Sequence, residues 1–143
     1  MALPSKISIT EFHNLVATAL PFAENFKFCI EHLDAGYARG RMVFDPRQLR
    51  PGGTLSGPAI MALGDYTMYA VVLSLIGQVE LAVTTNLTCN FLLKPRPVDL
   101  LAEGRIIKLG KRLAYGEVLL RSEGGEDLVA HITATYSIPP TSL

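Results

Sequence analysis

The stretch Arg50–Ala70, RPGGTLSGPAIMALGDYTMYA, decides the fold of this chain of 143 residues. A loop that contains glycine and proline leads into a predicted helix over residues 58–76, and Gly77 is placed to end that helix. The helix is almost wholly apolar and carries one carboxylate, Asp65. A helix that is apolar on all sides belongs in the core of a domain. Because carboxylates are seldom buried without a partner, Asp65 is a candidate functional residue.

The start of this helix is a candidate site for developing negative charge. Gly57 lies where unpaired N–H groups and the helix macrodipole favour an anion. Pro58 has no N–H, but at the first helical position it removes only a donor that helices leave unpaired. Ser56 is either the N-cap of the helix or a catalytic group. The segment therefore combines a candidate base, Asp65, with a candidate oxyanion site.

Length and composition predict one globular domain over residues 1–143, with an N-terminal helical segment over 1–25. Hydrophobic residues make up 49% and charged residues 18% of the chain, which excludes a disordered tail protein. Thirteen basic residues balance thirteen acidic ones, which argues against a nucleic-acid partner. The central helix is long enough to span a bilayer, but Asp65 and the alternating segments after it argue against a membrane protein.

The cysteine and histidine residues indicate neither a disulfide framework nor a metal site. Cys29 and Cys89 lie in apolar runs without a CxxC spacing, so we expect small buried side chains of a reducing compartment. His13, His32 and His131 are scattered without metal-ligand spacing. The N-terminus MALPSKISIT lacks the features of a signal peptide, and we expect a cytoplasmic protein.

The rest of the chain predicts a short helix and an antiparallel sheet. Apolar residues at helical spacing indicate an amphipathic helix over residues 8–20, which Pro21 ends. We expect a loop over 45–57. Strands are predicted over 26–33, 37–44, 80–93, 99–109, 113–122 and 128–138. Because no helical crossovers separate these strands, the fold class is α+β, with one curved sheet wrapped around the long helix.

Three blocks of sequence, in this order, resemble hotdog-fold acyl-CoA thioesterases of the phenylacetate-degradation type. Arg50–Asp65 is similar to the family's Asn-x-x-Gly-x-x-His-Gly-Gly loop followed by Ala-Leu-x-Asp. Thr84–Pro95 is similar to its Ser/Thr strand that ends in a Phe-Leu-x-Pro corner, and Gly104–Val118 to its hairpin with a basic turn. The resemblance covers nearly the whole chain after residue 25. It implies a hotdog fold, in which a long central helix is wrapped by a curved antiparallel sheet.

The resemblance also implies roles for individual residues. Asp65 would act as general base or nucleophile, and the Gly57 N–H would polarise the thioester carbonyl. Thr84 would bind the attacking water or the carboxylate, and Ser56 stands with these catalytic candidates. Positions expected to bind substrate are Arg50, Gly53, Pro58 and Tyr69, with Lys108, Lys111 and Arg112 for the phosphates of coenzyme A.

In this family the two halves of the site come from different subunits. The resemblance therefore implies a homodimer, commonly paired again into a dimer of dimers. It implies no cofactor, because the coenzyme A thioester is itself the substrate. The expected partner is thus an acyl-CoA molecule.

Three functions stay open from the sequence. The first is hydrolysis of acyl-CoA thioesters with a medium-chain or aromatic acyl group. The second is a non-hydrolytic hotdog protein that binds acyl-CoA or a fatty acyl ligand, because Arg50, Ser56 and Pro58 stand where the family has Asn, His and Gly. The third, a hydratase or dehydratase, would use a catalytic His, and no His lies in the loop or the helix. The acyl chain stays open, because a one-residue error in strand register inverts which side chains line a pocket.

Overall fold

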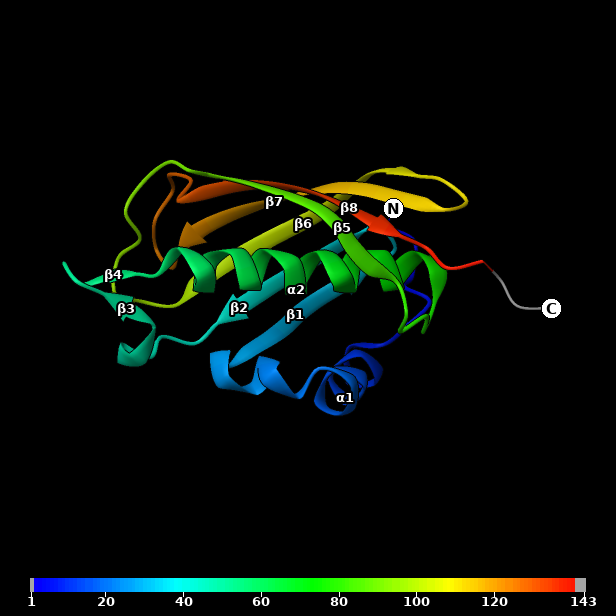
Figure 1. Cartoon of the computed structure of the whole chain (residues 1–143), viewed down its shortest axis with the longest axis horizontal. Coiled ribbons are helices and arrows are strands. Elements are labelled where there is room, and N and C mark those ends of the chain that lie inside the picture. Colours follow the sequence, from blue (N-terminus) through cyan, green and yellow to red (C-terminus); the bar gives the residue numbers. More distant parts are fainter. Residues whose placement is uncertain (1, 141–143) are drawn as a thin grey trace.

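One long helix, α2, lies against the inner side of a curved six-stranded sheet (Figure 1). The computed structural model describes residues 2–140, except for the side chain of Phe22. α2 spans Gly57–Ile76, and Gly77 ends it with a φ of 86°. Pro58 was predicted at the first position of the helix, but it is the second residue, because Gly57 already belongs to the helix.

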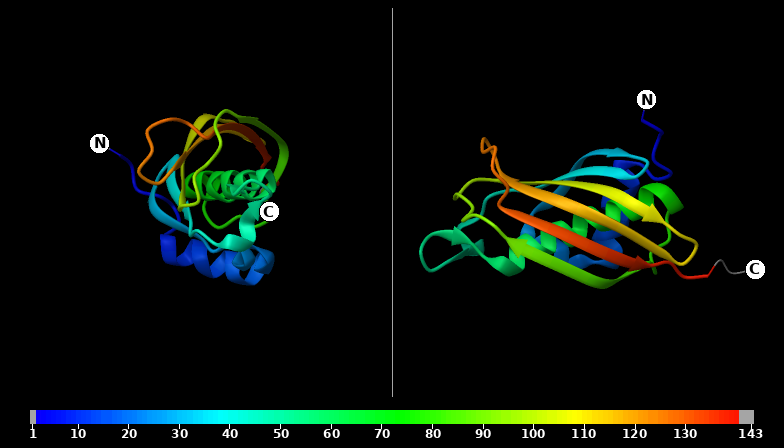
Figure 2. Two further views of the ribbon diagram at one scale, coloured as in Figure 1. Left: turned by 90° about the vertical axis from the view of Figure 1, so that its left-hand side faces the viewer. Right: turned by 90° about the horizontal axis from the view of Figure 1, so that it is seen from above.

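The sheet is antiparallel throughout, with the strand order β1-β2-β6-β7-β8-β5. Figure 2 shows from two directions how it wraps around α2. The predicted strands agree with the observed ones to within three residues at each end, and the α+β hotdog architecture is confirmed. The strands are β1 (Phe28–Asp34), β2 (Tyr37–Met42), β5 (Val83–Phe91), β6 (Leu100–Leu109), β7 (Leu113–Ser122) and β8 (Ala130–Ser137).

The segment over residues 45–57 contains more regular structure than the predicted loop. Strands β3 (Leu49–Arg50) and β4 (Thr54–Leu55) form a small hairpin of their own. Gly52 and Gly53 in its turn have φ values of 97° and 76°, in a region that glycine adopts without steric cost. The loop prediction was wrong because strands of two residues are too short to leave an alternating pattern in the sequence.

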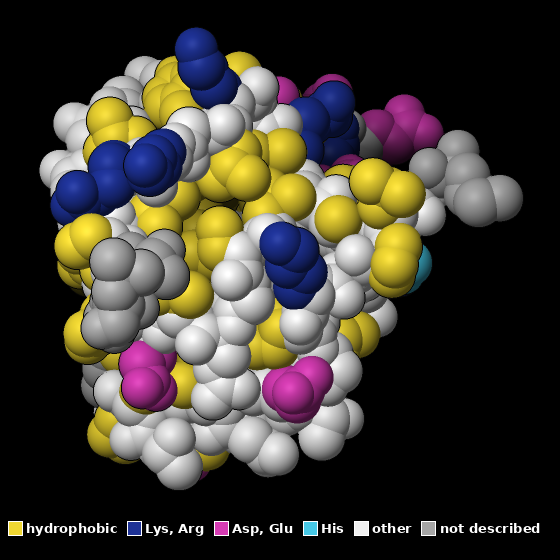
Figure 3. Space-filling view, turned by 90° about the vertical axis from the view of Figure 1, so that its right-hand side faces the viewer, with side chains coloured by type: hydrophobic (Ala, Val, Ile, Leu, Met, Phe, Trp, Pro, Cys, Tyr) yellow, Lys and Arg dark blue, Asp and Glu magenta, His cyan; other side chains and the backbone are white. Residues whose placement is uncertain are grey.

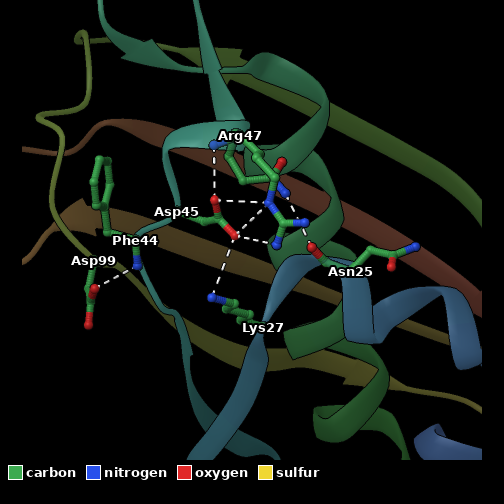
Figure 4. Close-up of polar contacts among 7 residues, drawn as sticks. Asn25, Lys27, Phe44, Asp45, Arg47 and Asp99 are labelled. Atoms are coloured by element: carbon green, nitrogen blue, oxygen red, sulfur yellow. Dashed lines mark hydrogen bonds and ion pairs between the residues drawn. The ribbon is translucent and has the colours of Figure 1, made fainter.

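Asp45 holds the chain between β2 and this hairpin (Figure 4). Asp45 is 5% exposed, and its carboxylate accepts hydrogen bonds from the backbone N–H of Arg47 at 2.9 Å and from the Arg47 guanidinium at 2.7 Å. The Lys27 Nζ lies 3.6 Å from Asp45 Oδ2. The hydrogen bonds from Arg47 hold the pKa of Asp45 well below its usual range. The side chain thus caps the short helix η2 (Pro46–Gln48), which precedes β3.

The N-terminal segment packs on the sheet as helix α1 (Ile9–Ala19) and the 3-10 helix η1 (Pro21–Phe26). The predicted helix 8–20 is thus one residue too long at each end, because Ser8 is the N-cap, where it forms a capping box with Glu11, and Leu20 is the C-cap. Its buried face is formed by Phe12, Leu15 and Val16.

The two edges of the sheet differ in how they are covered. At β1, His13 Nε2 accepts a hydrogen bond from the Ile30 N–H at 2.9 Å, and Pro4 forms a bridge with Asp34. At the other edge, β5 pairs only with β8 among residues 2–140. The outer edge of β5 therefore has no strand partner within the described residues.

By length and composition, α2 could cross a membrane, but 72% of an apolar 18-residue window of this helix is buried inside the fold.

Cys29 and Cys89 form no disulfide. Both side chains were predicted to be buried, but they are only half-buried, since each lies on a strand at an edge of the sheet. Burial raises the pKa of both thiols.

Candidate active site

A cavity of about 390 Å³ lies among α2, the N-terminal part of β5 and the N-terminal segment of the chain. Tyr66 and Tyr69 of α2 form part of its wall, and the Tyr69 hydroxyl donates to the carbonyl oxygen of Glu80 at 3.0 Å. Two carboxylate side chains, Asp65 and Glu80, also line it. The apolar part of the wall is formed by Leu20, Ala23, Phe28, Ala62, Leu81, Ala82 and Val83. The cavity therefore suits an apolar group held next to a carboxylate.

Asp65 is half-buried and receives two hydrogen bonds on the same oxygen. Thr84 Oγ1 donates to Oδ1 at 2.6 Å, and the Tyr136 hydroxyl donates to it at 2.7 Å. The Tyr136 hydroxyl also lies 3.1 Å from the Asp65 carbonyl oxygen. Within the described part of the chain, no cationic side chain forms an ion pair with Asp65, and the hydrogen bonds to its side chain come from hydroxyl groups. Hydrogen bonds to the ionised form of a carboxylate favour that form.

The two donors are direct cross-strand neighbours. Thr84 on β5 pairs with Tyr136 on β8, and the register of the two strands shifts immediately afterwards, between Thr84 and Asn86. On β8, buried residues alternate with half-buried ones, which places Tyr136 on the inner face toward α2. Tyr136 was not among the residues predicted from the sequence. The alternation of β8 was visible, but the pairing of Tyr136 with Thr84 depends on the register of strands far apart in the sequence.

Burial and the neighbouring Asp65 charge raise the pKa of Tyr136 well above its ordinary value. The hydroxyl therefore keeps its proton and stays a donor across the neutral pH range. Its ring is 3% exposed and stacks on Tyr69, with centroids 6.0 Å apart and planes at 18°. The ring packing thus sets the direction of the hydroxyl.

Gly57 lies in a different cavity from Asp65. This second cavity of about 500 Å³ is lined by Arg50, Gly57, Phe91 and Lys94, among others. Asp65 follows Gly57 by eight residues, and at 1.5 Å per residue the two are about 12 Å apart along α2. One chain therefore does not bring the candidate base and the candidate oxyanion donor together.

Gly57 lies at the N-terminal end of α2, directly after the N-cap residue Ser56. Ser56 Oγ accepts a hydrogen bond from the Ala59 N–H at 3.3 Å, so the side chain caps the helix. Gly57 is the first residue of the helix, so its N–H has no acceptor within the helix, and Pro58 has no N–H of its own. Gly53 lies exposed in the β3–β4 turn. Arg50 is exposed and lines the second cavity, so it does not pair with Asp65 of its own chain.

The basic residues of the β6–β7 turn form a third group. A cavity of about 440 Å³ is lined by Lys108, Lys111 and Arg112, together with Tyr115 and Thr135. The residues directly before and after Tyr115 and Thr135 on their strands are buried. This cavity is therefore on the outer face of the sheet. Arg112 also donates to the Ile138 carbonyl oxygen at 3.1 Å. Figure 3 shows the end of the molecule that carries this turn, where Lys and Arg side chains lie beside an apolar hollow.

The histidines are engaged elsewhere. His32 lies 2.7 Å from Asp34, and His131 lies 3.0 Å from Glu117. In the described range, no group of three or more His, Cys, Asp or Glu side chains could hold a metal ion.

The chain is similar to a known protein family in sequence and to solved structures in both sequence and fold. The family model described as Thioesterase superfamily matches residues 52–129, more than half of the chain. No curated protein matches the sequence. A solved structure from Silicibacter sp. TM1040, provisionally assigned as a thioesterase, is 42% identical; the match covers 98% of this chain and 97% of that one, with a TM-score of 0.87.

Two further solved structures are similar at lower identity. A mutant of the phenylacetic acid degradation protein PaaI from Thermus thermophilus is 25% identical over 83% of this chain and 99% of that one, with a TM-score of 0.74. Thioesterase superfamily member 2 of zebra fish is 17% identical over 92% and 95% of the two chains, with a TM-score of 0.79. At that identity, the second likeness supports the fold alone.

Proposed function

The chain belongs to the thioesterase superfamily, and on that premise we propose that it hydrolyses acyl-CoA thioesters to a free acid and coenzyme A. The observation that carries this proposal is Asp65, a carboxylate held by two hydroxyl groups in the wall of an otherwise largely apolar cavity. The cavity would hold the acyl group, and Asp65 would stand beside the thioester carbon.

In the proposed reaction, Asp65 acts in one of two ways. As a general base it takes a proton from a water whose oxygen bonds to the carbonyl carbon. As a nucleophile it attacks that carbon itself, and water then cleaves the resulting anhydride. In both cases the C–S bond breaks and the thiolate leaves and is protonated. A backbone N–H at the carbonyl oxygen, which we assign to Gly57, stabilises the oxyanion on the way.

Since Gly57 and Asp65 of one chain lie about 12 Å apart along α2, we propose a homodimer in which each site combines Asp65 of one chain with Gly57 of the other. The uncovered edge of β5 supports this arrangement. Two such dimers would pair into a tetramer. Light scattering after size exclusion is expected to give at least twice the 15.5 kDa mass of one chain.

Mixed dimers provide the sharper test of a shared site. Gly57→Pro removes the N–H and adds a ring, which the backbone can accept because Ser56 is already extended (φ −72°, ψ 149°) and proline is tolerated at the first helical position. Gly57→Ala is the matched control, since it adds the same Cβ, 3.3 Å from the half-exposed Phe91 ring, and keeps the N–H. We expect Asp65→Asn and Gly57→Pro each to be nearly inactive as homodimers.

When Asp65→Asn and Gly57→Pro chains are refolded together, about a quarter of wild-type turnover should return, because half of the dimers are mixed and each has one intact site. No recovery in mixtures whose subunit exchange is verified by mass spectrometry would contradict the shared site.

For the substrate, we propose a medium-chain or aromatic acyl group, as in the phenylacetate-degradation type. The aromatic and aliphatic wall of the cavity supports this choice. Lys108, Lys111 and Arg112 would bind the phosphates of coenzyme A, and Arg50 would contact the same anionic carrier. No cofactor is needed for this reaction, and we propose a cytoplasmic location.

A second candidate function is binding of acyl-CoA without hydrolysis. It is favoured by Ser56, which caps α2 where the family has a histidine, and by Arg50 in place of asparagine. Turnover of a panel of acyl-CoA esters, from acetyl to dodecanoyl and phenylacetyl, separates the two functions. We expect thiol release that is fastest for one medium-chain or aromatic ester. Tight binding of a non-cleavable CoA thioether in calorimetry, together with no thiol release from the matching thioesters, would replace hydrolysis with binding.

A further inference from the structure

Tyr136 was not a site candidate in the sequence, but it is a buried residue whose hydroxyl donates a hydrogen bond to the proposed base, Asp65. Its hydroxyl lies 2.7 Å from Asp65 Oδ1, and Thr84 Oγ1 lies 2.6 Å from the same oxygen. Within residues 2–140, no hydrogen bond reaches Asp65 Oδ2. The two carboxylate oxygens are therefore not equivalent.

We propose that Tyr136 is a positioning residue, which together with Thr84 holds Asp65 Oδ1 and leaves Oδ2 as the reactive oxygen. The inference rests on the proposed hydrolysis in naming Oδ2 the reacting atom. A carboxylate with two free oxygens can rotate about its Cβ–Cγ bond and offer either of them. Two donors on Oδ1, from neighbouring positions on β5 and β8, fix that rotation and keep one oxygen available.

The packing around Tyr136 supports a positioning role. The ring is 3% exposed and lies against Tyr69 of α2, so the hydroxyl has no freedom to turn toward solvent. Its cross-strand partner is Thr84, which means that one strand pairing delivers both donors. Tyr66, Tyr69 and Glu80 are the other titratable groups that line the cavity, and no Lys or Arg of the described residues lines it. Among the described residues, the hydrogen-bond donors in contact with the Asp65 side chain are thus hydroxyl groups.

Tyr136→Phe tests the proposal, because it removes the hydroxyl and keeps the ring. We expect kcat to fall by roughly 10-fold to 100-fold with little change in KM, since the substrate pocket keeps its shape and the base loses its orientation.

The matched control is Tyr37→Phe. Tyr37 donates to Glu103 Oε2 at the same 2.7 Å, but it lies on β2 and does not line the Asp65 cavity. This variant should keep the wild-type kcat and KM. A loss of kcat in both variants would mean that the effect comes from weakened folding, and it would overturn the positioning role.

A second readout separates this inference from the proposed hydrolysis. The carboxyl carbon of Asp65, assigned by its loss in Asp65→Asn, is observed by NMR at one fixed pH. Its resonance should move in Tyr136→Phe and stay in place in Tyr37→Phe, because only the first variant removes a hydrogen bond to Asp65 Oδ1, whether or not the protein turns over a thioester. An unmoved resonance in Tyr136→Phe would overturn the role of Tyr136 even in an active enzyme. A moved resonance in a protein without turnover would uphold the contact and reject the hydrolysis.

Discussion

Asp65→Asn is expected to lower kcat for acyl-CoA hydrolysis by about 10²- to 10⁴-fold, the range that a lost general base produces. The substitution keeps the size of the side chain, and the amide oxygen still accepts hydrogen bonds from Thr84 and Tyr136. What it removes is the ability to take a proton or to attack a carbonyl carbon. The measurement is thiol release from the best ester of the panel, at saturating substrate.

The control for this prediction is the other carboxylate on the cavity wall. Glu80→Gln should leave the rate within about threefold, because the Glu80 contact to Tyr69 is made by its backbone carbonyl and survives the change. Wild-type turnover in Asp65→Asn would reject the mechanism. Loss of turnover in Glu80→Gln alone would move the base to Glu80.

The largest expected effect on stability is at Phe12, in the N-terminal helix. Its side chain is fully buried and meets Tyr66 edge-on, with centroids 5.3 Å apart and planes at 75°, and it lies 5.8 Å from Tyr69. Phe12→Ala would leave a hole behind two residues of the cavity wall. We expect it to lower the free energy of unfolding by about 3–5 kcal/mol, as measured by urea denaturation.

Asn14→Ala serves as the control for Phe12→Ala, because Asn14 is on the same helix and its side chain lies outside the buried face formed by Phe12, Leu15 and Val16. It should change the free energy of unfolding by less than about 0.5 kcal/mol. Both variants and the wild type must be compared at one protein concentration, since the stability of a homodimer depends on it. A loss below about 1 kcal/mol in Phe12→Ala would mean that α1 is not an integral part of the core.

The fold could be predicted well because its signals are local. Gly77, the all-apolar run before it and the alternation of the later strands each act over a few residues. The β3–β4 hairpin was not predicted, because strands of two residues are too short to show an alternation of apolar and polar residues. Asp65, Thr84 and Tyr69 could be selected as site candidates, and they line one cavity. Gly57 and the basic turn were selected with them, but the structure places these groups in two other cavities.

By itself the sequence determined that a long apolar helix with one carboxylate would be wrapped by an antiparallel sheet, because helix ends and strand alternation are set by neighbouring residues. Only the tertiary structure decided which groups surround that carboxylate. The register of β5 against β8 places Thr84 and Tyr136 on the same oxygen of Asp65. The straight course of α2 keeps Gly57 away from it. Both are consequences of long-range packing, in which shifting one strand by a single residue would turn its side chains to the opposite face.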